Sequence, residues 1–408
     1  MKKIDKIFTV IVLSALSLTS FYSLFLKNQD TISYVENRTF KTNQDLSIRG
    51  ILSGEFESNL ETILSDQFID RYSFVKNKNL VNYQFVNFIY KLIENPLVLN
   101  PVGETYVNQI GSTQVLMSKP ILYSEIINQR IVDRAEQINE IASDYPEVEF
   151  FVYKPTQIQE KDFFDEANGI ESGGNIYEKS LSSTLEVPYS SFKIDSIDDY
   201  VKYFYTTDHH WNNQGSYQGY LDIMELMFDG SKIPVVPIDE SCKNGLKFFG
   251  TYSSQSGFVN EGSPFCVFKF DLVEYTLVSD GVLIEDPNDT NKYFDMTVTS
   301  EMDYHYNRAY GLGNGFVQIT SNIDNDESIL IIGDSYANPI LPLLANHFKN
   351  IYFVYPINYK GIFKEEFMYD SFIKENGIDK VLFMYTIENY FLSDEWGDRY
   401  IDFDVKRN

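Results

Sequence analysis

The chain of 408 residues has 33 lysine and arginine residues against 59 aspartate and glutamate residues, which gives a formal net charge of −26 at pH 7. A protein that binds nucleic acid needs a basic surface, so this balance excludes nucleic acid as a partner. The charge either confers solubility or favours a neutral substrate over a polyanion. The 32 phenylalanines and 30 tyrosines fit a buried core and are also compatible with stacking on sugars.

The first 27 residues predict a membrane anchor. Lys2, Lys3 and Lys6 precede an uncharged run from Ile7 to Leu26, which has about the length of a helix that crosses a bilayer. Basic residues before such a run place the following chain outside the cytoplasm. Because no small-x-small cleavage site follows, we predict a retained single-pass anchor in the cell membrane over residues 1–27, with a cleaved signal peptide as the alternative.

Residues 28–53 are polar with few apolar anchors and predict a tether. Residues 54–232 are predicted to be the first part of an α/β domain, with a buried strand over residues 148–153. Residues 162–191 are rich in glycine and serine and predict a surface loop or lid. Apolar residues recur at helical spacing in four segments, which predicts helices over residues 54–67, 73–93, 126–143 and 213–229.

Residues 233–325 are predicted to be a β-rich insertion, and residues 326–408 the second part of the α/β domain. Alternating β-prone runs and turn clusters in the insertion predict strands over 265–270, 275–278, 293–298 and 316–320. In the second part, strands and helices alternate: a strand from Ser328, a helix over 338–348, a strand over 351–355, a helix over 363–374 and a strand over 380–385. This alternation predicts a central parallel sheet, with the functional site outside the carboxyl ends of its strands.

The sequence contains two cysteines, Cys242 and Cys266. In an exported chain they form either one disulfide or two free thiols, because sequence alone does not give the geometry of the pair. His305 and His347 stand apart in sequence from the two adjacent histidines at 209 and 210. No Cys/His cluster with metal-ligand spacing is present, so we predict neither a metal nor another cofactor.

A first candidate for chemistry is the stretch Thr206-Thr207-Asp208-His209-His210-Trp211-Asn212-Asn213, which holds two of the four histidines. Asp208 and His210 are two residues apart, so a turn can bring carboxylate and imidazole together and fix one tautomer of a general base. A capping or surface role is the alternative. His209 then points elsewhere, and it and Trp211 are candidates for substrate contact.

A second candidate is Gly333-Asp334-Ser335, which follows a run of isoleucine and leucine. The run predicts a buried strand and Gly-Asp-Ser a tight turn, although many turns of this kind are only structural. A serine on a strand-to-helix turn presents its hydroxyl and its backbone N–H to an anion. Taken together, the two stretches predict Ser335 as nucleophile, His210 as base and Asp208 as the group that orients the base. Asn358 or Asn389 is a candidate for a second oxyanion donor.

Both stretches resemble a known family. Residues 207–212 are similar to the motif that names the bacterial DHHW proteins. Together with Gly333-Asp334-Ser335 they resemble the SGNH-hydrolase-like domain of the alginate O-acetyltransferases AlgJ and AlgX. Glu36-Asn37-Arg38 after the anchor, and the segment from Asp66 to Arg71, also resemble the amino-terminal part of DHHW proteins. The resemblance implies an SGNH-hydrolase-like three-layer sandwich with a central parallel sheet.

The same resemblance implies that the protein O-acetylates an extracytoplasmic exopolysaccharide or cell-wall glycan. A membrane-bound O-acyltransferase would supply the acetyl group, and Ser335 would carry it as an acetyl-serine intermediate. Two alternatives stay open. A carbohydrate acetylesterase would use the same scaffold and the same triad, and a non-catalytic glycan-binding subunit of an acetylation or export complex would keep only the fold.

Overall fold

The computed structural model describes residues 3–33, 38–46, 50–51, 53–93, 97–103, 105–110, 113–242, 245–257, 260–284, 305–311 and 314–390. The predicted strand over 293–298 and the Glu36-Asn37 part of the amino-terminal motif lie outside these residues.

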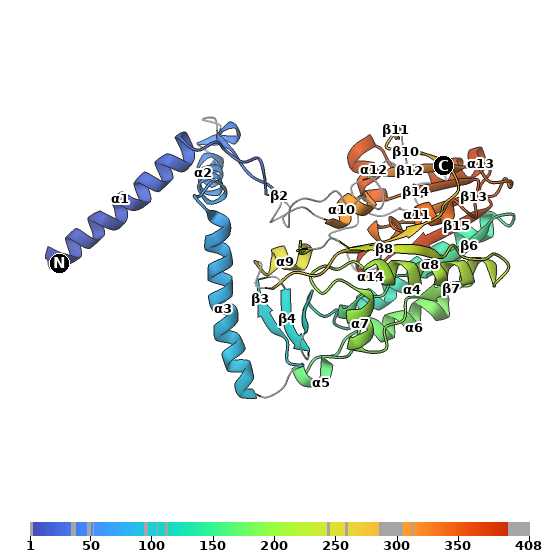
Figure 1. Ribbon diagram of the computed structural model, residues 1–408, viewed down its shortest axis with the longest axis horizontal. Coiled ribbons are helices and arrows are strands. Elements are labelled where there is room, and N and C mark those ends of the chain that lie inside the picture. Colours follow the sequence, from blue (N-terminus) through green and yellow to red (C-terminus); the bar gives the residue numbers. More distant parts are fainter. Residues whose placement is uncertain are drawn as a thin grey trace.

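The amino-terminal part of the chain consists of three helices beside the main body of the molecule, α1 (Lys3–Phe25), α2 (Glu55–Asp66) and α3 (Arg71–Ile93) (Figure 1). Among the described helices, α1 has the length and apolar composition to cross a membrane. The short strands β1 (Ile32–Ser33) and β2 (Arg38–Thr39) pair with each other, and η1 (Asn43–Asp45) follows. The described part of the predicted tether is bonded to α2, because the backbone N–H of Lys41 donates to the Asp66 carboxylate (3.0 Å).

An eight-stranded sheet forms the centre of the described chain, in the order β11-β10-β12-β14-β13-β15-β6-β7. Its strands are β6 (Glu149–Lys154), β7 (Tyr189–Ser191), β10 (Tyr275–Ser279), β11 (Val282–Ile284), β12 (Phe316–Ser321), β13 (Ser328–Gly333), β14 (Asn350–Val354) and β15 (Lys380–Met384). The five strands from β14 to β7 are parallel, whereas β12, β10 and β11 add to them in antiparallel pairing.

The prediction of a parallel sheet was therefore wrong for one edge, and the sheet is mixed. The three antiparallel strands come from the segment predicted as a β-rich insertion, which thus extends the central sheet. β10 and β11 are joined by Asp280-Gly281, both with positive φ (49° and 79°). A two-residue Asp-Gly turn of this kind makes an antiparallel hairpin, so the signal was present in the sequence.

Alternate residues of the central strands face two separate cores. In β13, Ile329 and Ile331 belong to one core and Leu330 and Ile332 to the other, because side chains alternate across a strand. The first core is covered by α7 (Ile197–Tyr203), α8 (Asn213–Phe228) and α11 (Leu341–Leu344). The second is covered by α4 (Glu125–Asp144), α6 (Gly174–Thr184) and α13 (Tyr369–Asn376). Helices thus cover both faces of the sheet, in three layers (Figure 1).

Three predicted segments differ from the structure. The helix expected over 338–348 is only the short α11, because Pro339 and Pro342 lack the N–H that a continuous helix needs. The helix expected over 363–374 begins later, as α13, because α12 (Pro356–Phe363) ends at Lys364, which has a φ of 60°. The expected lid over 162–191 contains α5 (Asp165–Asn168), α6 and β7.

Smaller elements complete the described chain. β3 (Asn100–Val102), β4 (Thr105–Ile110) and β5 (Thr113–Met117) form a three-stranded antiparallel sheet. β8 (Pro237–Cys242) and β9 (Cys266–Phe270) form a two-stranded ribbon in which Cys242 and Cys266 face each other and are joined in a disulfide. The remaining short helices are η3 (Ile158–Glu160), α9 (Thr251–Gln255), α10 (His305–Tyr310), η4 (Ser335–Ala337) and α14 (Ile387–Tyr390).

Candidate active site

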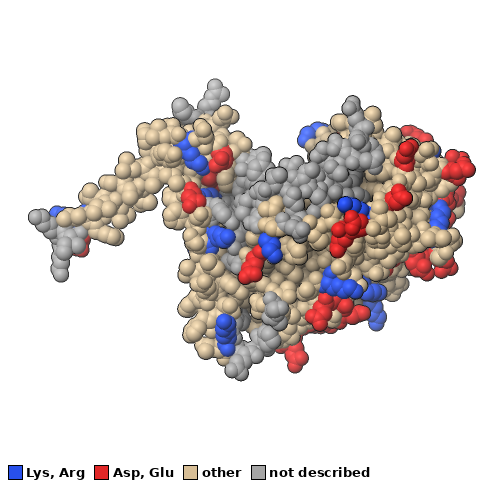
Figure 2. Space-filling model, in the orientation of Figure 1, with Lys and Arg blue, Asp and Glu red and all other residues tan. Residues whose placement is uncertain are grey.

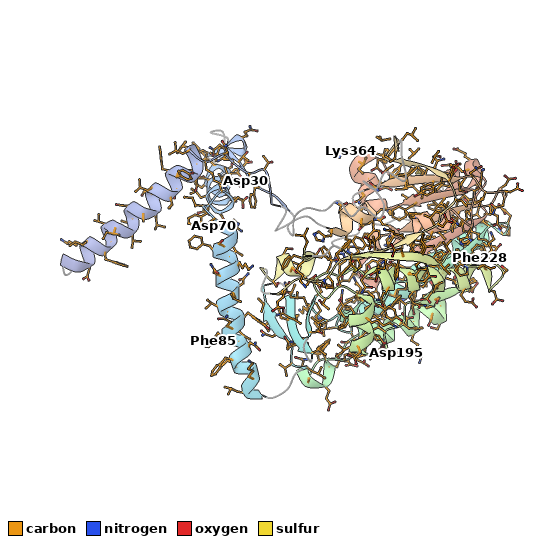
Figure 3. All side chains as sticks on the ribbon, viewed as in Figure 1. Asp30, Asp70, Phe85, Asp195, Phe228 and Lys364 are labelled. Carbon is orange, nitrogen blue, oxygen red and sulfur yellow. A yellow bond between two sulfur atoms is a disulfide. The ribbon has the colours of Figure 1, made fainter. Side chains whose placement is uncertain are left out.

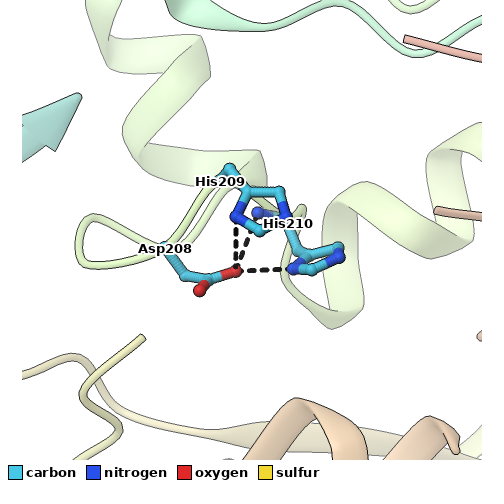
Figure 4. Close-up of side chains that lie close together, drawn as sticks. All are labelled: Asp208, His209 and His210. Carbon is cyan, nitrogen blue, oxygen red and sulfur yellow. Dashed lines mark hydrogen bonds and ion pairs between the residues drawn. The ribbon is translucent and has the colours of Figure 1, made fainter. Parts of the chain in front are cut away.

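The Asp-His-His stretch forms a tight turn between α7 and α8 (Figure 4). One carboxylate oxygen of Asp208 accepts a hydrogen bond from the backbone N–H of His210 (3.0 Å), which makes an Asx turn. The same oxygen lies 2.6 Å from Nδ1 of His210. Asn212 then caps α8 by accepting hydrogen bonds from the backbone N–H groups of Gln214 and Gly215. The turn therefore directs the imidazole toward the carboxylate two residues before it.

Asp208 is buried at the centre of this arrangement. Its second oxygen accepts a hydrogen bond from the backbone N–H of Thr251 (2.6 Å), at the start of α9. Burial raises the pKa of Asp208, but the imidazoles of His209 and His210 and the hydrogen bonds lower it by more, so the pKa lies well below its usual range. Asp208 is therefore ionised at neutral pH. An ionised carboxylate accepts the Nδ1–H of His210, so that the lone pair of the imidazole is on Nε2, where it can accept a proton.

Ser335 begins η4 directly after β13, in the middle of the sheet. Asp334 holds this turn with both oxygens: one accepts from the backbone N–H of Tyr336 (3.1 Å), the other from the N–H and hydroxyl of Thr386 (both 3.0 Å). Thr386 follows β15, the strand beside β13. A Cβ at Gly333 would lie 2.6 Å from the carbonyl oxygen of Met384. The glycine thus permits close approach of the two strands, and the aspartate ties the turn to the neighbouring strand.

The hydroxyl oxygen of Ser335 lies 2.7 Å from Nε2 of His210, across 125 residues of chain. Both side chains are almost completely buried. Together with the bond at Nδ1, this contact makes a continuous hydrogen-bonded chain from Ser335 through His210 to Asp208. The structure therefore brings together the three side chains predicted as nucleophile, base and orienting group. They meet at the carboxyl ends of parallel strands, where ligands bind in open α/β sheets.

Two tyrosines that the sequence did not single out enclose the His210 imidazole. The ring of Tyr306 stacks on it, with centroids 4.0 Å apart, and the Tyr306 hydroxyl donates to the carbonyl oxygen of Ser335 (3.2 Å). The ring of Tyr336 lies 5.2 Å from the imidazole, and its hydroxyl donates to the carbonyl oxygen of His209. Tyr336 adjoins Ser335 in the sequence and could have been suspected, whereas nothing in the sequence links Tyr306 to either motif.

His209 lies at the edge of the same group, with 30% of its side chain exposed. Its Nδ1 is 3.7 Å from Asp208, and its ring contacts the rings of His210 and Tyr252. Burial and the neighbouring His210 imidazole lower the pKa of His209 to about 4, against the opposing effect of Asp208. His209 is thus a neutral, partly accessible imidazole beside the hydrogen-bonded chain, a position compatible with its predicted contact with substrate.

The remaining residues predicted to contact substrate or an oxyanion are Trp211, Asn358 and Asn389. Trp211 is completely buried and packs against Tyr336 and Gly219, so its ring serves the core and does not reach a substrate, which corrects the prediction. The amide of Asn358 donates to the carbonyl oxygen of Asn314 (3.4 Å). Asn389 falls in α14, but its side chain lies outside the part that the structure describes.

A small cation could in principle draw ligands from Asp208, His209 and His210, whose candidate ligand atoms lie within 4.8 Å of one another. The 2.6 Å separation of Asp208 and His210 is a hydrogen-bond distance. Two ligands of one tetrahedral zinc, at bonds of about 2.1 Å, would lie roughly 3.4 Å apart. The distance between Asp208 and His210 therefore fits a hydrogen bond between them and not two ligands of one zinc ion. A second group of candidate ligands consists of Glu240, Cys242 and Cys266. Its two cysteines are joined in the disulfide and offer no thiolate to a metal.

Comparisons with known proteins identify solved structures of similar fold. Neither protein-family models nor curated proteins give a match. Among solved structures, a DHHW family protein from Eubacterium siraeum is 17% identical, with a TM-score of 0.55 over 73% of this chain and 95% of its own. PatB1 from Bacillus cereus is 19% identical, with a TM-score of 0.55 over 71% of this chain and 98% of its own. The O-acetyltransferase domain of Pseudomonas putida AlgJ is 10% identical, with a TM-score of 0.41 over 74% and 98%.

The predicted resemblance is thus confirmed at the level of the fold: over some seven-tenths of its length, this chain folds as the DHHW family protein and PatB1 do.

Proposed function

We propose that the chain is an extracytoplasmic O-acetyltransferase of a neutral exopolysaccharide or cell-wall glycan, built on an SGNH-hydrolase-like scaffold. The observation that carries the proposal is the hydrogen-bonded chain from Ser335 through both nitrogens of His210 to Asp208. A serine hydroxyl is a weak nucleophile at neutral pH, and an adjacent base held by a carboxylate is what activates it. Ser335 is then the nucleophile, His210 the general base and Asp208 the orienting group.

In the first half-reaction, Nε2 of His210 accepts the Ser335 proton as the hydroxyl oxygen attacks the carbonyl carbon of an acetyl ester. The imidazolium returns that proton to the leaving oxygen, which releases the donor alcohol and leaves acetyl-Ser335. In the second, His210 takes the proton of a sugar hydroxyl, the sugar oxygen attacks the acetyl carbon, and Ser335 leaves and recovers a proton. Ionised Asp208 stabilises the imidazolium in both halves.

The negative oxygen of each tetrahedral intermediate needs N–H donors. The backbone N–H of Ser335 is the first candidate, because Asp334 fixes the turn on which it lies. The element that begins at Ser335 is the one-turn η4, so this stabilisation comes from local N–H groups and not from a long helix dipole. Asn358 and Asn389 remain the candidates for a second donor.

Membrane anchoring supports transfer over hydrolysis. The apolar helix α1 would hold the catalytic part of the chain at the membrane. Tethering raises the local concentration of a donor system that is itself in the membrane. The proposed partner is a membrane-bound O-acyltransferase that delivers the acetyl group to the side of the membrane on which the polysaccharide lies.

The test is to give the detergent-solubilised full chain an activated acetyl ester, with and without neutral oligosaccharides. We expect release of the ester alcohol together with sugar-dependent O-acetylation. Release of acetate that is insensitive to sugar would instead identify an acetylesterase. Sugar binding without any turnover would identify a non-catalytic glycan-binding subunit.

A second readout does not depend on the acceptor. A structure of PatB1 carries a sulfonyl adduct, and sulfonyl fluorides react with activated serines. We expect such a reagent to modify this chain at Ser335, as mapped by mass spectrometry of its peptides. Labelling of other serines with Ser335 untouched would count against the nucleophile assignment.

Gly250 supplies a further prediction, because it lies directly against Asp208. A Cβ at position 250 would lie 2.2 Å from the Cβ of Asp208 and 2.3 Å from Oδ2. Gly250→Ala must therefore displace the carboxylate from His210, and we expect it to cost roughly 1–3 kcal/mol of folding free energy and to lower kcat for ester turnover. Thermal unfolding and the turnover assay measure the two effects.

Gly361→Ala is the matched control for Gly250→Ala, since a Cβ at position 361 meets nothing within 4 Å. It should leave turnover unchanged and should not lower the folding free energy, because alanine is more favourable than glycine inside helix α12. Wild-type turnover in Gly250→Ala would mean that the position of Asp208 does not limit the reaction.

A further inference from the structure

Helix α3 presents an apolar face that the described part of the chain leaves exposed. Six large side chains on it are exposed by 41–68%: Phe74, Val81, Phe85, Phe88, Ile89 and Leu92. Their spacing is helical, so they form one stripe along the outer side of α3. Figure 3 shows Phe85 on the side that faces away from the sheet.

The opposite face of α3 is the one that packs on the body. The hydroxyl of Tyr83 accepts a hydrogen bond from Gln114 in β5 (3.1 Å), and the Tyr83 ring packs on the small core of Val107 and Leu116. Asn79 lies so close to Gly257 that a Cβ there would be 2.0 Å from the Asn79 amide nitrogen. Because this face is occupied, α3 cannot rotate to bury its apolar stripe against its own chain.

The charge of α3 is opposite to that of the whole protein. Its four charged residues are all basic, namely Arg71, Lys76, Lys78 and Lys91, in a chain of net charge −26. In the view of Figure 2, basic side chains lie along α3 and most of the visible acidic ones lie on the body, farther from α1. A helix with aromatic and aliphatic residues on one face and lysines around them is the pattern of a helix that lies in the headgroup region of a membrane.

The start of α3 is held next to the end of α1, the candidate membrane span. The buried side chain of Gln67, between α2 and α3, accepts a hydrogen bond from the backbone N–H of Asp30 (3.1 Å) and donates to the Asp30 carbonyl (2.8 Å). Asp30 follows α1 by five residues. α1 also leaves the molecule on the side toward which the stripe faces (Figures 1 and 3).

We infer that the outer face of α3 docks on an anionic lipid surface, beside the point where α1 enters the membrane. The stripe enters the boundary between headgroups and acyl chains, and Lys78 and Lys91 contact anionic headgroups. A second copy of this chain fits the face less well, because pairing along the stripe would bring together two helices that each carry four positive charges and no negative one. Docked in this way, α3 would fix the height of the body above the bilayer.

The test uses the full chain reconstituted in vesicles of 70% phosphatidylcholine and 30% phosphatidylglycerol. Because the native cysteines are joined in a disulfide, a nitroxide can be attached to a single added cysteine in Phe85→Cys. We expect lipid-soluble oxygen to relax this label strongly and a water-soluble nickel chelate weakly. The matched control is Ile233→Cys, at an apolar side chain on the body that is 88% exposed, whose label should be accessible to the nickel chelate.

Substitutions that remove a positive charge from α3 provide the second part of the test. Lys78→Gln and Lys91→Gln should each lower the ratio of docked to undocked α3 by about fivefold in these vesicles. They should have no such effect in pure phosphatidylcholine, and turnover of a soluble acetyl ester should be unchanged. A label at position 85 that stays accessible to the nickel chelate in every vesicle would overturn the inference. So would strong spin–spin broadening between copies, which would identify a second chain as the occupant.

Discussion

Replacing Ser335 with alanine is expected to lower kcat for acyl turnover by roughly four to six orders of magnitude. The variant keeps the acidic and basic members of the site but has no oxygen to attack the acetyl carbon, so no acetyl-enzyme can form. Pre-steady-state release of the ester alcohol, followed by mass spectrometry of the intact chain, measures both turnover and acetylation. No acetylated chain should accumulate in the variant.

The fold should survive this change, because the Ser335 side chain makes a single described hydrogen bond, to His210, and losing it costs on the order of 1 kcal/mol. Ser321→Ala is the matched control. Ser321 is equally buried, donates to the carbonyl oxygen of Phe348 (2.8 Å), and lies at the amino-terminal edge of the parallel strands, away from the site. It should lose similar stability and no activity. Near-normal rates in Ser335→Ala would remove the serine from the mechanism.

His210→Ala is expected to reduce kcat about as severely as Ser335→Ala, by roughly 10⁴-fold or more. The two residues act as one catalytic unit, so losing either one disables it and the effects of the two losses are not additive. Nε2 of His210 is the only described group that contacts the Ser335 hydroxyl. The double variant should therefore be no slower than either single variant. Turnover of the same activated ester by all three proteins gives the comparison.

His209→Ala is the internal control, since it removes the neighbouring imidazole of the same motif. His209 lies 3.7 Å from Asp208, whereas the hydrogen bond described for the Ser335 hydroxyl is to His210. We therefore expect a loss of about tenfold or less, which is the effect of a weakened interaction and not of a missing base. If His209→Ala lost more activity than His210→Ala, the base would have been assigned to the wrong histidine.

Secondary structure was predictable wherever the apolar pattern was strong. The predicted helix over 126–143 is α4, and the predicted strands over 148–153 and 380–385 are β6 and β15, to within one or two residues. These segments agree because burial on one face of a helix, or on both faces of a central strand, imposes a regular pattern. The prediction of a helix over 338–348 was wrong, because the apolar residues of this segment do not compensate for Pro339 and Pro342, which lack a backbone N–H.

The direction of the edge strands was harder to predict than their existence. β10 and β12 were found as β-prone runs. The antiparallel pairing of β12 with β14, and of β10 with β12, depends on which edge of the sheet is free, and sequence periodicity is the same for either direction. Only the Asp280-Gly281 turn carried a local signal of the hairpin.

The reactive residues of the candidate site were visible in the sequence, because the chain has only four histidines and because carboxylate, imidazole and hydroxyl each occurred at the boundary of an element. Asp208 and His210 are joined by a local turn, which a two-residue spacing is enough to predict. The environment that makes them useful was not visible. Tyr306, Gly250 and Thr251 reach Asp208, His210 or Ser335 only through the tertiary fold, and tyrosine and glycine are too common to mark a site.

The sequence by itself thus determined the apolar segment of α1, the α/β alternation and the identities of the carboxylate, imidazole and hydroxyl residues of the candidate site, because each is set by local composition or by neighbours in the chain. The tertiary structure decided that the Ser335 hydroxyl and Nε2 of His210 lie 2.7 Å apart, that the sheet is mixed, and that the apolar face of α3 is left exposed by the residues the structure describes. These are long-range properties. They depend on which distant segments share a core, and that choice is made by the packing of the whole chain and not by any one stretch of it.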